Sequence, residues 1–393
     1  MKKALRKIHL WLSVPTGIII TLVCFSGAML VFEKEITEAI KPELYFVKEA
    51  KGEPIPMQQL MEKVEETLPD SVSISGVTVF ADSIRTYQVS LTKPRRASIY
   101  VNQYTGEVTG RSERLPFFNT MFHLHRWLLG SSSGVGKLLT GICTLVLVFI
   151  LLTGILMWLT NRNKPLKASL AIHVTKGWGR FWHDLHVAGG IYTTIFLLAM
   201  ALTGLTWSFS WYRTGFYACF GVESSEKGGA HGEGGNSHGE GKGSHGEGRY
   251  NHGDGRNNHE GKRGEGRGFH RRSPYRHWDD VLNEVALKNP GYQQITLKPE
   301  VAEVVPEGRL SMRATDKYSY DRRSGEITDV QLYSAGKKDT KVRSGVYMVH
   351  TGSWGGIITR ILNFLAAFIG ATLPLTGYWL WFRRKRAAIA HHH

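Results

Sequence analysis

The chain has 393 residues and a formal net charge of +16, with 42% hydrophobic residues. Its mean hydropathy of −0.20 averages strongly apolar segments with charged ones. Because the basic residues cluster in short segments beside the apolar ones, where they orient membrane proteins, the charge does not indicate nucleic-acid binding. Three cysteines are too few for a disulfide framework.

Four segments without a charged residue are long enough to cross a bilayer. Each holds at least the roughly 20 residues that a transmembrane helix needs. They lie between Lys7 and Glu33, Lys137 and Arg162, Asp184 and Arg213, and Arg360 and Arg383. The sequence therefore predicts a membrane α-helical protein with a four-helix transmembrane bundle.

The short basic segments set the expected orientation, because such segments stay in the cytoplasm. Both termini and the connection between the second and third spans are basic, so the two long connections lie on the opposite side. The predicted organisation is a cytoplasmic N-terminus 1–8, first span 9–32, outside domain 33–116, short helix and second span 117–160, cytoplasmic basic loop 161–182, third span 183–212, second outside domain 213–345, short helix and fourth span 346–382, and cytoplasmic tail with a tag remnant 383–393.

The two halves of the chain repeat one pattern of span, outside domain and span. His9 to Gly27 has the same separation as His186 to Gly204. The outside segments YVNQYTGEVT (100–109) and YSYDRRSGEIT (318–328) also correspond. Because each half has two spans, the repeats are expected to be parallel, related by an axis along the membrane normal.

Each outside domain is predicted to be a small α+β unit, a helix followed by an antiparallel sheet. In the first we expect a helix over 57–68 and strands over 77–80, 87–91 and 97–102. In the second we expect a helix over 278–288 and strands between 295 and 330.

A glycine-rich insert over 224–272 precedes the second of these domains. It is almost free of apolar residues and is expected to be disordered. Neutral imidazoles at this spacing suit loose binding of Zn, Ni, Cu or iron, and the alternative is a low-complexity repeat without a dedicated role. The histidines recur at every seventh residue: His231, His238, His245, His252 and His259.

Each span carries a hydroxyl residue followed by glycine, with a histidine at or just before its opposite end. Eighteen residues make about five helical turns, so His9 and Gly27 share a helix face. Histidine in a bilayer usually faces the bundle interior. We therefore expect two haem b groups, one held by His9 and His186 near the cytoplasm and packed against Gly154 and Gly377, and one held outside by His125 and His350 and packed against Gly27 and Gly204.

Two of these ligands have a neighbouring alternative. The repeat alignment pairs His123 with His350, and His183 lies three residues before His186. Any single histidine at a membrane interface can equally be a satisfied polar residue, and it is the duplicated set of four that favours ligation. The basic residues that would pair with haem propionates are Arg126, Lys137 and Arg360 near the outer site and Arg6 and Arg180 near the inner one.

The span motifs IHLWLSVPTGI, FHLHRWLLG, HDLHVAGGIY, VHTGSWGGIITRIL and LTGYWLWF resemble the PepSY-associated transmembrane family of bacterial iron-regulated inner-membrane proteins. The segments YVNQYTGEVTG and YDRRSGEITD look like the strand-turn-strand of PepSY modules. The resemblance implies a multi-pass inner-membrane protein with two PepSY-like periplasmic domains. It also implies a di-haem reductase that passes electrons to ferric siderophores, with His9, His125, His186 and His350 as ligands. The His/Gly insert departs from this pattern.

The leading hypothesis is therefore a transmembrane oxidoreductase that reduces a periplasmic ferric siderophore or another iron chelate. The predicted cytoplasmic segments have no glycine-rich dinucleotide motif and are too short for a flavin or nicotinamide domain, so the donor is expected to be a separate protein, a small reductant or the quinone pool. Two alternatives remain: a PepSY module that binds peptides or restrains a peptidase, and a periplasmic metal-binding or sensing protein that uses the His/Gly tract.

Overall fold

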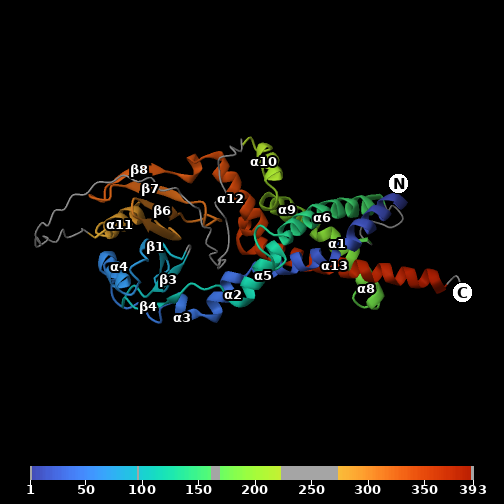
Figure 1. Cartoon of the computed structure of the whole chain (residues 1–393), viewed down its shortest axis with the longest axis horizontal. Helices are drawn as coiled ribbons and strands as arrows, with labels where there is room; N and C mark the ends of the chain where they lie inside the picture. The colour runs from blue at the N-terminus through green and yellow to red at the C-terminus, as the bar shows by residue number, and fades with distance from the viewer. Residues whose placement is uncertain (1, 95–96, 161–168, 223–272, 391–393) are drawn as a thin grey trace, which may run out of the picture.

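The computed structural model describes residues 2–94, 97–160, 169–222 and 273–390, with side chains to 386, and it has two parts. A helical bundle occupies one end of the molecule and a β-sheet the other, and both chain termini lie at the end of the bundle far from the sheet (Figure 1). The His/Gly tract lies outside the described residues.

Four helical segments of the described chain are long and apolar enough to cross a membrane: Lys2–Leu30, Val135–Thr160, Trp178–Ser208 and Ser353–Arg386. They contain α1 (Lys2–Leu30), α6 (Val135–Thr160), α8 (Trp178–Asp184) with a π-helical turn (Leu185–Gly189) and α9 (Gly190–Ser208), and α13 (Gly356–Ala390).

The bundle closes because α1 and α9 each pack against both α6 and α13, so that α1 and α9 lie diagonally opposite. Its interior is formed by Ile20, Cys24, Cys143, Leu151, Leu197 and Ala371. Large apolar side chains such as Ile18 and Ile195 instead point outward, with exposed fractions of 65% and 71%. Outward apolar side chains are expected of helices that face lipid.

Short helices connect the bundle to the sheet: α2 (Glu33–Ile40), α3 (Pro42–Tyr45), α5 (Pro116–Trp127), α10 (Ser210–Ala218) and α12 (Lys338–Thr351). The two that precede α6 and α13 end in left-handed residues, Leu128 at φ 49° and Gly352 at φ 76°. A separate short helix thus precedes each of α6 and α13, as the sequence predicts for the second and fourth spans.

In the part of the chain that the structure describes, eight strands form one antiparallel sheet in the order β4-β3-β2-β1-β5-β6-β7-β8. The strands are β1 (Ile74–Phe80), β2 (Tyr87–Leu91), β3 (Ser98–Val101), β4 (Val108–Arg111), β5 (Gln294–Lys298), β6 (Val301–Val305), β7 (Asp316–Tyr320) and β8 (Ile327–Gln331). Each half of the chain supplies four consecutive strands, and β1 pairs with β5 at the centre.

The two outside regions therefore share one sheet, whereas the sequence predicts two small domains. At the joint, the Thr78 and Thr296 hydroxyls lie 2.8 Å apart. Gly76 lies so close to the Leu297 carbonyl that a Cβ there would be 2.7 Å from its oxygen. A side chain at residue 76 would push the two central strands apart.

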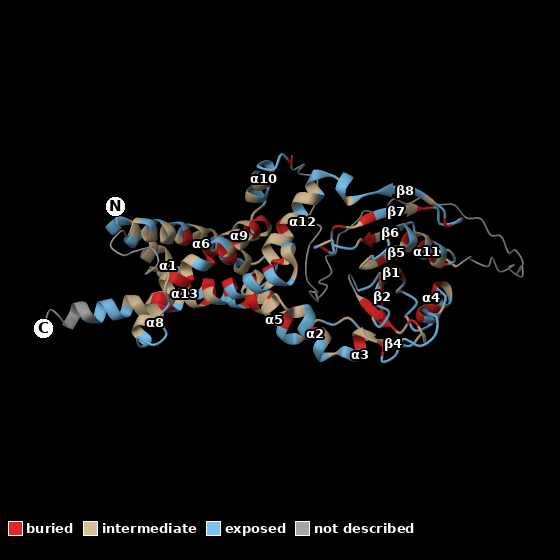
Figure 2. Ribbon diagram, turned by 180° about the vertical axis from the view of Figure 1, so that it is seen from behind, coloured by how far each residue is buried: buried red, intermediate tan, exposed pale blue. Residues whose placement is uncertain are grey.

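One core covers both halves of this sheet. Helix α4 (Met57–Glu66) contributes Leu60 and Met61, and α11 (Trp278–Lys288) contributes Trp278 and Val281, all almost fully buried. Figure 2 shows buried residues both on the strands of the sheet and on the helices that cover it. The helix over 278–288 has the predicted bounds, and the one predicted over 57–68 ends at Glu66.

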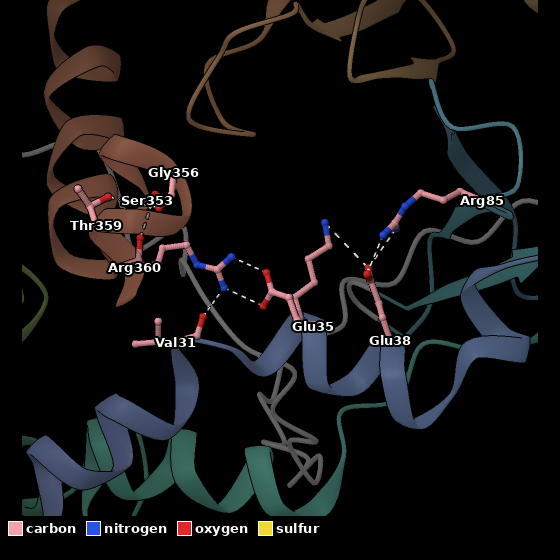
Figure 3. A network of polar contacts seen from close by, with 10 residues as sticks. Val31, Glu35, Glu38, Arg85, Ser353, Gly356, Thr359 and Arg360 are labelled. Atoms are coloured by element: carbon pink, nitrogen blue, oxygen red, sulfur yellow. Dashed lines mark hydrogen bonds and ion pairs between the residues drawn. The ribbon is translucent and has the colours of Figure 1, made fainter. Parts of the chain in front are cut away.

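Helix α2 ties the sheet to the bundle through two ion pairs, drawn in Figure 3. Glu35 accepts a hydrogen bond from Arg360 of α13 at 2.8 Å, and Glu38 lies 2.7 Å from a guanidinium nitrogen of Arg85, just before β2. The hydrogen bond from Arg360 holds the pKa of the Glu35 carboxyl below its usual value. A short helix thus carries charges that contact both parts of the molecule.

Candidate cofactor centres

The structure gathers four histidines into two pairs inside the bundle and at its sheet end. The ring centres of His9 and His186 are 6.4 Å apart, and those of His125 and His350 are 6.0 Å apart. Two imidazoles on one metal ion, each with its nitrogen at roughly 2 Å from the metal, have ring centres about 6 Å apart. Both pairs have the spacing of two ligands that share one ion.

Backbone carbonyls fix the tautomer of three of these imidazoles. Nδ1 of His125 lies 2.9 Å from the Val23 oxygen, and Nδ1 of His350 lies 2.9 Å from that of Met200. His186 Nδ1 lies 3.1 Å from the Leu373 oxygen. A carbonyl only accepts hydrogen bonds, so each Nδ1 carries the proton and Nε2 keeps its lone pair. This second contact is the one that metal-binding histidines usually make.

The hydroxyl residue before each glycine supports the same arrangement at three positions. Thr153 Oγ1 lies 3.0 Å from His9 Nδ1, Thr376 Oγ1 3.0 Å from His186 Nδ1, and Thr203 Oγ1 3.2 Å from His350 Nδ1. Each threonine donates its own proton to a backbone carbonyl in the preceding turn, so it accepts from the imidazole. Ser26 donates to its own helix, and its partner His125 uses the Val23 carbonyl.

The four glycines face imidazoles, each at the histidine pair to which the sequence assigns it, and their packing against a haem stays a prediction. A Cβ built on Gly27 would lie 2.8 Å from His125 Cε1, and one on Gly204 would lie 3.1 Å from His350 Cε1. The corresponding distances are 3.3 Å from Gly377 to His186 and 3.7 Å from Gly154 to His9. The hydroxyl-glycine motif therefore positions a histidine. At three of the four sites the hydroxyl accepts a hydrogen bond from Nδ1, and at all four the glycine leaves space for the imidazole ring.

The two pairs lie at different depths of the bundle. His9 belongs to the inner pair, and Gly27 contacts His125 of the outer pair. The two residues are 18 positions apart on α1, which is a rise of roughly 27 Å. Buried apolar residues of all four helices lie between these levels. The arrangement places one centre toward each face of the apolar layer.

The alternative ligands lie outside the pairs. His123 stacks edge-on against Trp127 with ring centres 4.9 Å apart, and His183 Nδ1 lies 3.2 Å from Asp184 Oδ1. Of the two residues considered at each position, it is His125 that pairs with His350 and His186 that pairs with His9.

The predicted propionate partners have varied surroundings. Arg360 is engaged by Glu35, and Arg180 Nε lies 2.8 Å from the buried Asp184. Arg126 lies over the Phe122 ring, Lys137 begins α6 half-buried, and Arg6 is exposed on α1. Protein carboxylates thus account for the charges of Arg360 and Arg180, and the propionate role of all five stays a prediction.

No cluster of three or more metal-ligating side chains occurs among the residues described here. His231, His238, His245, His252 and His259 lie outside them, so the predicted metal tract is not part of this geometry. Paired imidazoles whose Nε2 atoms have no hydrogen-bond partner among the described residues remain as the candidate cofactor site of the bundle.

A family model described as the PepSY-associated TM region matches residues 6–384, nearly the whole chain. The chain belongs to the PepSY-associated TM family. This confirms the resemblance drawn from the span motifs, and with the four apolar helices it indicates a multi-pass membrane protein. A search of curated proteins finds no match to the chain.

In this member of the PepSY-associated TM family, a π-helical turn at the inner histidine pair was not predicted from the sequence. His186 lies in the π-helical turn Leu185–Gly189, between α8 and α9. A π turn holds one extra residue and is frequent at functional sites. The local sequence signal for this turn is the glycine pair Gly189 and Gly190. Gly189 packs closely against α13, since a Cβ there would lie 3.4 Å from a side-chain carbon of Ile369.

Proposed function

We propose that this protein is a di-haem b reductase of the bacterial inner membrane that passes electrons from the cytoplasmic side to a periplasmic ferric siderophore or similar iron chelate. The observation that carries the proposal is the presence of two histidine pairs. Each pair has the spacing of two ligands of one ion, and the imidazoles donate hydrogen bonds through Nδ1, which leaves Nε2 for the metal.

The residues that would hold haem are His9 with His186 and His125 with His350. Haem iron with two histidine ligands is saturated and supplies one-electron transfer in preference to oxygen binding. The chain's own part is to keep Nε2 deprotonated, through the Val23, Met200 and Leu373 carbonyls, and to exclude water with the apolar residues between the pairs.

The orientation rests on the basic segments. The connection before α8 and the last turns of α13 are rich in Lys and Arg, as cytoplasmic segments are. The sheet at the opposite end of the molecule would then lie in the periplasm, next to the His125–His350 pair carried by α5 and α12 (Figure 1).

The acceptor is the reaction's substrate. One electron converts Fe³⁺ in an oxygen chelate to Fe²⁺, a softer and less charged ion that such ligands hold less strongly. The iron is then released and the chelator is unchanged. The reaction requires one electron for each iron atom.

The test uses purified protein in lipid nanodiscs, reduced with a limiting amount of dithionite and mixed with a ferric siderophore and a ferrous-ion indicator. We expect the reduced haem spectrum to be lost while about one Fe²⁺ appears for each electron withdrawn. The gallium complex of the same siderophore is the matched control, since Ga³⁺ is not reduced. Protein that is reoxidised by an artificial acceptor and ignores every ferric chelate would contradict the proposed substrate.

A further inference from the structure

A cleft of about 510 Å³ opens at the end of the bundle far from the sheet, between α8 and the last turns of α13. Its volume is within the usual range for small-molecule sites. The lining residues are Lys176, Gly177, Gly179, Arg180, His183, Leu380 and Arg383.

The cleft is positively charged. Its neighbouring carboxylate, Asp184, is 4% exposed and is occupied by Arg180 Nε at 2.8 Å and His173 Nδ1 at 2.8 Å. Within the described part of the chain, no carboxylate pairs with Lys176 or Arg383. Two exposed cations therefore remain for an anion that enters the cleft.

The guanidinium of Arg383 lies between two residues of the bundle. It lies 5.2 Å from the ring centre of Trp379. On the other side, a Cβ at Gly179 would lie 2.5 Å from Arg383 Nη1, so only glycine allows this approach. This exposed guanidinium lines the cleft, where its planar fork can donate two hydrogen bonds to one phosphate.

The cleft also lies beside the inner histidine pair. His183 lines it and precedes His186 by three residues, about one helical turn or roughly 5 Å along the helix. A redox-active molecule in the cleft would thus sit next to the centre that we assign to the cytoplasmic side.

The chemistry of such a molecule is limited by what the pair accepts. A bis-histidine haem takes one electron at a time, which a hydride donor such as a reduced nicotinamide does not deliver singly. A reduced flavin does, and its mononucleotide carries a phosphate with close to two negative charges.

We propose that the cleft between α8 and α13 binds the phosphate of reduced flavin mononucleotide, as the soluble electron donor of this protein. This rests on the proposed reductase function. One reduced flavin gives two electrons in two single steps and releases two protons, forming oxidised flavin, and two ferric chelates become ferrous.

The test measures binding of oxidised flavin mononucleotide to the full-length protein in zwitterionic nanodiscs, through flavin fluorescence. A charge-assisted hydrogen bond contributes about 1.5–3 kcal/mol, or tenfold and more in affinity. We expect riboflavin, which lacks the phosphate, to bind at least about tenfold more weakly. The double variant Lys176→Gln/Arg383→Gln should lose the same factor, and Arg386→Gln, a basic residue of the same tail outside the cleft lining, should stay within about twofold.

Equal affinity for riboflavin and its phosphate, or no loss in the double variant, would overturn the inference. An anionic lipid headgroup shares the phosphate chemistry and is tested with phosphatidylglycerol in the nanodisc. If this lipid protects the cleft from flavin, and flavin binding without it remains no better than that of riboflavin, the occupant is a headgroup and the inference fails.

Failure of the donor and failure of the function are separable. Oxidised flavin binds without any haem, so a haem-free protein that still prefers the phosphate form would end the reductase assignment and retain the anion site. A protein with two haems that does not distinguish the two flavins would retain the reductase and lose this donor.

Discussion

The His9–His186 and His125–His350 pairs use the same local device on different supports. The inner pair projects from the long segments that cross the bundle, α1 and the π turn before α9. The outer pair sits in the last turn of the short helices α5 and α12, which end in left-handed residues directly afterwards. The comparison shows that a carbonyl, a hydroxyl turn and a glycine can position an imidazole without regard to the helix that carries it.

The two pairs also differ in how tightly their imidazoles are seated. Against a Cβ built on the facing glycine, the outer rings leave 2.8 and 3.1 Å and the inner rings leave 3.3 and 3.7 Å. Trp207 adds a ring contact at 5.0 Å to His350. We therefore expect the outer centre to tolerate less change than the inner one.

The largest effect is expected from removing one ligand of either pair. His186→Ala or His125→Ala leaves one imidazole in a centre built for two, so bound haem should fall from about two to about one per chain. Pyridine haemochrome assay of the purified variants, referred to protein concentration, gives the count.

The neighbouring histidines provide matched controls for these variants. His183→Ala and His123→Ala should retain two haems, because neither imidazole lies in a pair. A full complement in His125→Ala together with loss in His123→Ala would reverse the assignment at the outer centre.

Alanine substitution of the glycines tests the difference in seating. Gly27→Ala puts a methyl 2.8 Å from an imidazole carbon, where the ring must shift, whereas Gly154→Ala puts one at 3.7 Å, an ordinary contact. Haem occupancy should fall severely at the outer centre of Gly27→Ala and remain nearly complete in Gly154→Ala. Equal behaviour of the two variants, judged by haem per chain and redox titration, would remove the distinction between the pairs.

The spans and the histidine set were predictable because they depend on local sequence. Charge-free runs mark helices in a bilayer, and the 18-residue spacing repeats in both halves. The strand pairing of β1 with β5 was not predictable, since it joins residues more than 200 positions apart. It also depends on the absence of a side chain at Gly76, which lets the Leu297 carbonyl approach.

The role of the glycines could be predicted only in part, for a related reason. From sequence, a glycine opposite a histidine leaves space, and nothing local says whether a macrocycle or a ring fills it. The carbonyls of Val23, Met200 and Leu373 carry no sequence signal at all, because every residue has one. Only the packing of helices shows which carbonyl meets an imidazole.

A smaller effect is expected from the hydroxyls of the inner pair. His186 Nδ1 has two acceptors, Thr376 Oγ1 at 3.0 Å and the Leu373 carbonyl at 3.1 Å, whereas His9 Nδ1 lies 3.0 Å from Thr153 Oγ1 and has the Ile150 carbonyl only as a weaker second acceptor. Thr153→Val should therefore shift the midpoint potential of the inner centre more than Thr376→Val. We expect shifts of at most about 60 mV, a tenfold change for a one-electron couple, measured by spectroelectrochemical titration. A larger shift in Thr376→Val would show that the hydroxyl is the main acceptor of His186.

The smallest effect concerns the link between bundle and sheet. Arg360 lowers the pKa of Glu35, so this pair contributes stability above the ordinary pKa of 4.5 and loses it as the pH falls below that value. Glu35→Gln should cost no more than about 1 kcal/mol at neutral pH, because Glu35 is half-exposed and screened. Thermal unfolding in detergent should show a deficit that narrows toward pH 3.5 and in high salt. If the loss of stability in Glu35→Gln persisted at acid pH, its cause would be altered packing and not the lost ion pair.

The most direct test of the account is the optical spectrum of the purified protein, oxidised and then reduced with dithionite, with haem counted per chain. Two bis-histidine centres predict a sharp reduced α band and about two haems per chain. Protein produced with ample haem that shows no such band, and binds none when haem is added, would contradict the assignment of the two histidine pairs.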